Sequence, residues 1–208
     1  ESLTYDDLAE VLVIATGNRN KILEIKEKFS ETEHLEILSL SDFKNIPEII
    51  EDADTFSGNA IKKARVIRDF TSLPSLADDS GLVIDALNGE PGVFSARYGG
   101  EGLTDRDRYL LVLDKMKGVP DYERSARFVC SIAIALPDGR EFLSEGLCEG
   151  RIALVPCGDK GFGYDPIFYL PEYGRTMAEL TLDIKNSISH RGKALEHASV
   201  VIKELAGG

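Results

Sequence analysis

The stretch VLVIATGNRNKILEIKEKF, residues 11–29, decides the fold of this chain. Its first five residues are apolar and rich in β-branched side chains, which is typical of a buried strand. Thr16-Gly17-Asn18 then predicts a tight turn, and apolar residues recur at helical spacing at Ile22, Ile25 and Phe29. A strand, a tight turn and a helix in this order predict the opening of an α/β domain.

The rest of the chain supports a mixed α/β fold with at least one antiparallel strand pair. Pro137-Asp138-Gly139 separates two long apolar runs and predicts a hairpin. Ser80-Gly81 predicts a hinge that divides residues 75–84 into two strand pieces, and Thr55 is a candidate N-cap. The expected strands are 11–15, 35–38, 126–136 and 140–152, and the expected helices are 21–29, 55–70, 104–117 and 189–205.

Composition limits the classes of function. The chain has 208 residues, 36 acidic and 24 basic side chains and a net charge of −12. A nucleic-acid or anionic-membrane binder needs a basic face, so both classes are disfavoured. No run approaches the ~20 apolar residues of a membrane-spanning helix. An anionic small ligand remains compatible with this charge, because a few cations can reverse the local field.

Residues 1–10 and the cysteines carry little functional signal. The first ten residues are acidic and polar, unlike a secretory signal, and we expect a disordered N-terminal extension before a single domain over 11–208. Cys130, Cys148 and Cys157 are odd in number and lack CxxC spacing. They predict reduced thiols in a cytoplasmic protein more readily than a disulfide or zinc site.

Two segments in the first half could handle phosphate and metal. The residues 16–21 lie where a strand gives way to a helix, a position that favours anions, and Lys21 adds a positive charge. Asp78-Asp79 follows an apolar run, and because adjacent strand side chains point to opposite faces, one carboxylate would address a given cleft. That carboxylate could hold Mg²⁺ or activate water. A plain structural turn explains the first segment equally well, and a solvated strand end is the commoner outcome for a segment like the second.

Two segments in the second half could recognise a base. Residues 158–165 combine three glycines with Phe162 and Tyr164, and an aromatic ring can stack on a base. Ser189 is a natural N-cap, while His190 and Arg191 are donors suited to acceptor oxygens. Taken singly, each of these residues has an ordinary structural explanation. Together, the four segments supply an anion-binding turn, a carboxylate pair, an aromatic ring and two donors, a combination that predicts nucleotide hydrolysis.

The order of these motifs resembles that of the inosine triphosphate pyrophosphatase family, which acts on dITP and XTP. The matching motifs include TGNRNK at 16–21, LADDSGL at 76–82, GFGYDP at 161–166 and SHRGKAL at 189–195. The resemblance covers the chain from about Val11 to Ala198. It implies an elongated mixed sheet flanked by helices, with two lobes and a central nucleotide-binding cleft, and a homodimer in the cytoplasm.

The resemblance also implies roles for individual residues. Asp79 is similar to the family's proton acceptor and, with Glu51, to its Mg²⁺ ligands. The residues that would bind the triphosphate are Thr16, Gly17, Asn18, Arg19, Asn20, Lys21 and Lys63. The residues that would contact the rest of the substrate, on the base and sugar side, are Ser80, Phe162, Gly163, Tyr164, Asp165, Lys185, His190 and Arg191. The implied reaction converts ITP, dITP or XTP into the monophosphate and pyrophosphate.

Two rival interpretations remain open at this point. One is a nucleotide pyrophosphatase of broader specificity, and the other is a nucleotide-binding protein without activity. The second is disfavoured because a pure binder does not need both Glu51 and Asp79. The chain also departs from its relatives at Gly58, Arg108, Leu111 and Cys157, none of which carries the expected chemistry.

Overall fold

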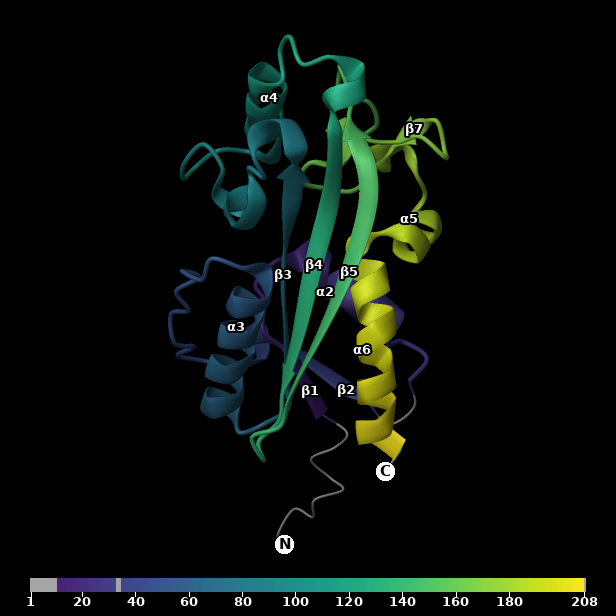
Figure 1. Ribbon diagram of the computed structural model, residues 1–208. Helices are drawn as coiled ribbons and strands as arrows, with labels where there is room; N and C mark the ends of the chain where they lie inside the picture. The colour runs from purple at the N-terminus through teal and green to yellow at the C-terminus, as the bar shows by residue number, and fades with distance from the viewer. Residues whose placement is uncertain (1–10, 33–34, 208) are drawn as a thin grey trace, which may run out of the picture. The chain divides into compact units, whose positions relative to one another are not determined.

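The computed structural model describes residues 11–32 and 35–207. The expected N-terminal extension, residues 1–10, lies outside the described residues. The strands are β1 Val11–Ile14, β2 Glu36–Ser39, β3 Ser75–Ile84, β4 Ser125–Ala135, β5 Glu141–Ile152, β6 Phe168–Leu170 and β7 Arg175–Thr176. The α-helices are α2 Arg19–Lys28, α3 Phe56–Thr71, α4 Asp105–Lys115, α5 Leu182–Ile188 and α6 His190–Gly207 (Figure 1).

The strands form one seven-stranded mixed sheet in the order β2-β1-β3-β4-β5-β6-β7. β1 runs parallel to β2 and β3, whereas β5, β6 and β7 are successively antiparallel. The mixed α/β prediction is therefore confirmed. Among the described residues, no helix is long and apolar enough to cross a membrane.

The opening strand–turn–helix forms as its sequence predicts. β1 is almost fully buried, because its apolar side chains lie between the two hydrophobic clusters of this region. α2 starts where Asn18 caps it by accepting hydrogen bonds from the N–H groups of Asn20 and Lys21. Lys26 and Lys28 in the last turn suit the negative end of the helix dipole.

α3 begins at the predicted N-cap. The Thr55 hydroxyl accepts a hydrogen bond from the Gly58 N–H at 3.0 Å. A Cβ at position 58 would lie 2.9 Å from both the Ala53 Cβ and the Thr55 Oγ1, so the glycine suits this tight helix start. The helix buries Ala60, Ala64 and Ile67 and ends at Ser72, which is left-handed with φ 58°.

The predicted hinge at Ser80-Gly81 is wrong. β3 is one continuous strand from Ser75 to Ile84. Gly81 is buried and is not among the glycines with positive φ, so it keeps the extended backbone of its neighbours. β4 lies next to β3 in the sheet, and the Leu82 N–H donates to the Ser95 hydroxyl at 2.9 Å, so tertiary contacts override the local preference for a turn.

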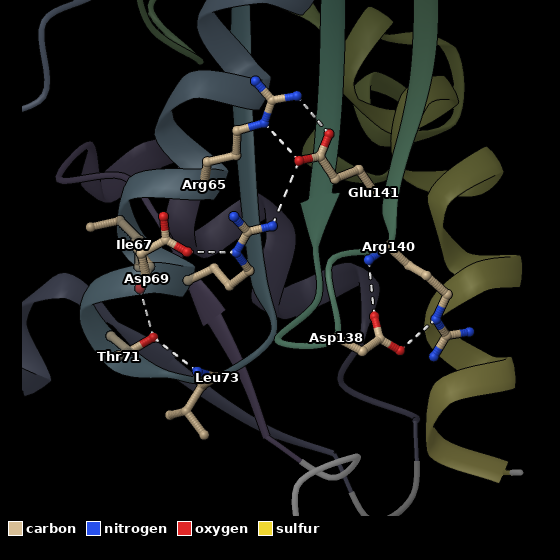
Figure 2. Close-up of polar contacts among 9 residues, drawn as sticks. Arg65, Ile67, Asp69, Thr71, Leu73, Asp138, Arg140 and Glu141 are labelled. Atoms are coloured by element: carbon tan, nitrogen blue, oxygen red, sulfur yellow. Dashed lines mark hydrogen bonds and ion pairs between the residues drawn. The ribbon is translucent and has the colours of Figure 1, made fainter.

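The predicted turn between β4 and β5 is confirmed. Gly139 takes φ 95°, and the Leu136 N–H donates to the Arg140 carbonyl at 2.9 Å. Figure 2 shows Glu141, at the start of β5, accepting from the Nε and Nη2 of Arg65 on α3 at 2.6 and 2.8 Å. Arg65 is half exposed, so this pair adds at most ~1 kcal/mol of stability.

The chain divides into two compact units. Among the described residues, unit 1 comprises 11–32, 35–79, 130–146 and 193–207, and unit 2 comprises 80–129 and 147–192. Unit 1 has two hydrophobic clusters, one of which packs α2 and α6 residues and the other α3 residues. Unit 2 has its own cluster, which includes Phe128, Tyr164 and Phe168. The chain passes from one unit to the other between Asp79 and Ser80.

Candidate active site

The turn between β1 and α2 carries the predicted phosphate-binding residues. Residues 17–20 are exposed, and the Asn18 N–H donates to the Thr16 hydroxyl at 3.2 Å. The Asn18 Oδ1 already accepts from the N–H groups of Asn20 and Lys21, at 3.0 and 3.3 Å. A phosphate that uses these two N–H groups must therefore share them with the cap or displace it.

A cluster of acids and lysines in unit 1 includes the predicted Glu51, Lys63 and Asp79. The Lys63 Nζ lies 2.5 Å from the Glu51 Oε1, and the Lys21 Nζ lies 3.1 Å from the Asp78 Oδ2. Burial opposes the charge of Lys63, but Asp78, Glu51 and Asp79 outweigh it and raise the Lys63 pKa. One lysine thus interacts with all three carboxylates.

Asp78 and Asp79 are both buried, and they have different partners. Asp78 pairs with Lys21, whereas the Asp79 Oδ2 accepts a hydrogen bond from the Asn59 Nδ2 at 3.1 Å. Their direct partners differ, although both carboxylates also interact with Lys63. Asp78 and Asn59 are not among the predicted site residues. Their only sequence signal is proximity to Asp79 and Lys63 along the chain, in ADDSG and GNAIKK.

Asp79 differs from a solvent-exposed aspartate in its acid–base behaviour. Burial raises the pKa of Asp79 to about 6, although Lys63, the Asn59 hydrogen bond and Lys21 all act to lower it. A carboxyl with a pKa close to neutrality can both accept and release a proton near physiological pH. Asp79 is therefore equipped to act as a general base.

The loop over residues 158–165 in unit 2 is organised by Asp165. The buried Asp165 Oδ2 accepts from the Phe162 N–H at 3.1 Å and from the Lys185 Nζ at 2.9 Å. A Cβ at Gly161 would come within 2.1 Å of the same oxygen, so only glycine fits there. Asp165 thus fixes both the backbone of Phe162 and the ammonium of Lys185.

The ring of Phe162 lies beneath two cations. The Lys185 Nζ is 4.4 Å from its centroid, and the Arg191 Cζ is 5.6 Å away. Tyr164, the other predicted aromatic of this loop, is buried, and its hydroxyl donates to the Ser95 carbonyl at 2.6 Å. Burial raises the pKa of Tyr164 well above its usual value. Phe162 is the ring available for stacking, and Tyr164 anchors the loop.

The junction of α5 and α6 positions the predicted donor pair. Ser189 caps α6 as predicted, because its hydroxyl accepts from the Gly192 N–H at 3.0 Å. His190 is buried and stacks on Phe128, with ring centroids 4.7 Å apart and planes 19° apart. The Arg191 Nη2 donates to the Ser80 hydroxyl at 3.0 Å.

The structure therefore gathers the predicted residues into two sets. Unit 1 holds Lys21, Glu51, Lys63 and Asp79 in its acid–lysine cluster. Unit 2 holds Ser80, Phe162, Asp165, Lys185 and Arg191 through direct contacts, with His190 next to Arg191 in sequence. Within the described part of the chain, no three His, Cys, Asp or Glu side chains form a group that could hold a metal ion by themselves.

Comparison with known proteins identifies one family and closely related sequences. The model of the Ham1 family matches residues 12–200. The dITP/XTP pyrophosphatase of Shouchella clausii is 50% identical over 88% of this chain and 92% of its own length. That of Geobacillus kaustophilus is 46% identical over 95% of this chain and 96% of its own length.

Solved structures of Ham1 proteins have the same fold as this chain. A HAM1 protein from Coxiella burnetii matches with a TM-score of 0.86 and 45% identity, over 93% of this chain and 98% of that one. The Staphylococcus aureus Ham1 protein matches with a TM-score of 0.84 and 36% identity, over the same shares of the two chains.

Fold and side chains define an α/β protein that contains a buried carboxylate of raised pKa beside two lysines, and an aromatic ring that contacts two cationic side chains. The chain belongs to the Ham1 family. The family resemblance stated from the motifs alone is thereby confirmed.

Proposed function

We propose that this chain is a nucleoside-triphosphate pyrophosphatase that converts ITP, dITP and XTP into the monophosphate and pyrophosphate. The names of its relatives support the substrate class. The observation that carries the chemistry is the buried Asp79, whose pKa of about 6 suits a general base and which interacts with Lys63 and Lys21.

The acid–lysine cluster fits a divalent cation such as Mg²⁺. Glu51 and Asp79 are close enough for Glu51 to raise the Asp79 pKa, and carboxylate oxygens are ligands that Mg²⁺ prefers. Mg²⁺ typically uses one or two carboxylates and completes its shell with water and substrate phosphates, so two acids suffice. We propose Glu51 and Asp79 as the protein ligands. Bound there, the cation would neutralise charge that develops on the leaving pyrophosphate.

The charge balance of the same cluster gives a second argument for the cation. Glu51, Asp78 and Asp79 outnumber Lys21 and Lys63, so the cluster is net negative when all five side chains are ionised. A triphosphate is negative as well. A divalent cation reverses the sign of the field, and the two lysines then add to the attraction.

In the proposed reaction, Asp79 takes the proton of a water molecule whose oxygen attacks the α-phosphorus. The bond from the α-phosphorus to the bridging oxygen breaks, and pyrophosphate leaves. Lys21 and Lys63 stabilise the negative charge on the departing phosphates. Asn59 holds the Asp79 carboxylate by a hydrogen bond to Oδ2, which leaves Oδ1 for the water.

Base selection is proposed to rest on unit 2. Phe162 would stack on the purine, and His190 and Arg191 would donate to its 6-keto oxygen. An adenine 6-amino group leaves such donors unmatched, which costs ~1–3 kcal/mol for each buried group. These donors would account for the rejection of ATP. Guanine carries the same 6-keto group and needs a separate contact at its 2-position.

The decisive experiment incubates the protein with Mg²⁺ and ITP, XTP, GTP or ATP in parallel and separates the products. We expect pyrophosphate and monophosphate, with ITP and XTP consumed fastest. Release of orthophosphate would contradict the chemistry. Equal rates with ATP would favour a pyrophosphatase of broader specificity, and binding without turnover would favour a pure nucleotide-binding protein.

The homodimer and the cytoplasmic location stay predictions.

A further inference from the structure

The first turn of α4 in unit 2 is held in place by several hydrogen bonds. Thr104 and Asp107 form a capping box, in which the Thr104 hydroxyl accepts from the Asp107 N–H and the Asp107 carboxylate accepts from the Thr104 N–H. Arg108 donates to the carbonyls of Leu103 and Gly100. These bonds fix the start of the helix relative to the preceding loop.

Asp105, the first residue of this helix, contacts the loop that carries Phe162. The Asp105 Oδ2 accepts a hydrogen bond from the Gly163 N–H at 2.9 Å, between residues 58 positions apart in the chain. The neighbouring Phe162 N–H donates to Asp165. Two carboxylates from different parts of unit 2 therefore hold two consecutive N–H groups of the loop.

The loop needs such support because of its backbone. Gly158, Gly161 and Gly163 all have positive φ, at 89°, 73° and 62°. Glycine-rich segments lose more conformational freedom on ordering than other segments do. A ligand that needs an ordered loop binds more weakly when binding itself must order it.

We propose that Asp105 is a positioning residue, which pre-orders the Phe162-Gly163 backbone so that the Phe162 ring is ready to stack on a purine. The inference rests on the proposed function and deepens it. Asp105 touches the loop and not the base, so its effect should appear in nucleotide affinity much more than in turnover. The amide oxygen of an asparagine can also accept from Gly163, whereas alanine cannot.

The test compares Asp105→Ala, Asp105→Asn and the control Glu101→Ala. Glu101 is an exposed acid in the loop before α4, so its loss removes the same charge and leaves the capping box of the helix intact. Only Asp105 bonds to Gly163. For each variant we would measure kcat and KM with ITP, and the Kd of IMP and of pyrophosphate by calorimetry.

For Asp105→Ala we expect KM for ITP and Kd for IMP to rise about three- to tenfold, the range set by one lost hydrogen bond. We expect kcat to change less than about twofold, and the affinity for pyrophosphate, which lacks a base, to stay unchanged. Asp105→Asn should restore most of the loss. Hydrogen–deuterium exchange in residues 158–165 of the ligand-free protein should be faster in Asp105→Ala than in Glu101→Ala.

Three results would overturn the inference. The first is an Asp105→Ala variant that matches wild type in every constant. The second is an equal rise of KM in Glu101→Ala, and the third is a loss of pyrophosphate affinity that accompanies the loss of IMP affinity. Failure of the proposed function is a separate outcome, because wild-type protein would then fail to hydrolyse ITP, whatever the variants do to the affinity for IMP.

Discussion

Replacing Asp79 by asparagine should make the metal-free protein more stable at neutral pH. Burial raises the pKa of Asp79 to about 6 from its ordinary value of 3.8. The folded protein therefore binds this proton more tightly than the unfolded chain does. Above about pH 6, ionised Asp79 lowers the free energy of unfolding by its full amount. This penalty decreases as the pH falls from about 6 to 3.8.

The size of the stability gain follows from the shift of the Asp79 pKa. A difference of about two pKa units corresponds to ~3 kcal/mol at pH 7.5, since each unit is worth ~1.4 kcal/mol. At pH 4 most Asp79 is protonated when folded, and the penalty falls below ~1 kcal/mol. The asparagine side chain would be neutral at every pH and could still accept from Asn59. We therefore expect a gain of ~2–3 kcal/mol at pH 7.5 that nearly vanishes at pH 4.

Urea denaturation of wild type and Asp79→Asn in a chelator, at pH 7.5 and pH 4, measures this gain. The matched control is Asp78→Asn. It removes the partner of Lys21, whose side chain is only 15% exposed, and should destabilise the protein by ~2 kcal/mol at pH 7.5. At pH 7.5, the same substitution is therefore predicted to stabilise the protein at Asp79 and to destabilise it at Asp78.

A stability loss in Asp79→Asn at pH 7.5 would refute the reasoning, and so would a gain of the same size at both pH values. The same variant should lose turnover while it keeps most of its affinity for nucleotide. Complete loss of nucleotide binding in the folded variant would mean that Asp79 serves the substrate more than the water.

Three further results are expected. Chelation should abolish ITP hydrolysis and Mg²⁺ should restore it; full activity in chelator would contradict a metal role. Phe162→Leu removes a stacking ring worth ~1–3 kcal/mol, so KM for ITP should rise about tenfold or more, with pyrophosphate affinity as the unchanged reference. Asp165→Asn weakens a buried pair with Lys185 and should lower the free energy of unfolding by ~3 kcal/mol in urea; an unchanged midpoint would show that the pair adds nothing.

The local elements of the fold were predictable because local rules set them. The apolar run and turn of residues 11–29, the cap at Thr55 and the turn at Gly139 depend on side-chain spacing and φ preferences within a few residues. The short strands β6 and β7 and the helix α5 were not predicted. Each is at most seven residues long, too short for a periodic pattern to stand out.

The hinge assigned to Ser80-Gly81 marks the limit of such rules. Serine and glycine favour a turn when only local preference is considered. The neighbouring strand β4 and the hydrogen bond from the Leu82 N–H to the Ser95 hydroxyl keep the backbone extended around Gly81. Tertiary hydrogen bonding decided this position.

By itself, the sequence determined the α/β class and the family and predicted a set of site residues, because these depend on the order of motifs along the chain. Tertiary structure alone decided what those residues do to one another. Burial raises the Asp79 pKa, and Asp78 forms an ion pair with Lys21. The Tyr164 hydroxyl donates a hydrogen bond to the carbonyl of Ser95, 69 positions away. Long-range contacts of this kind depend on how distant segments pack, and no pattern within a few residues encodes them.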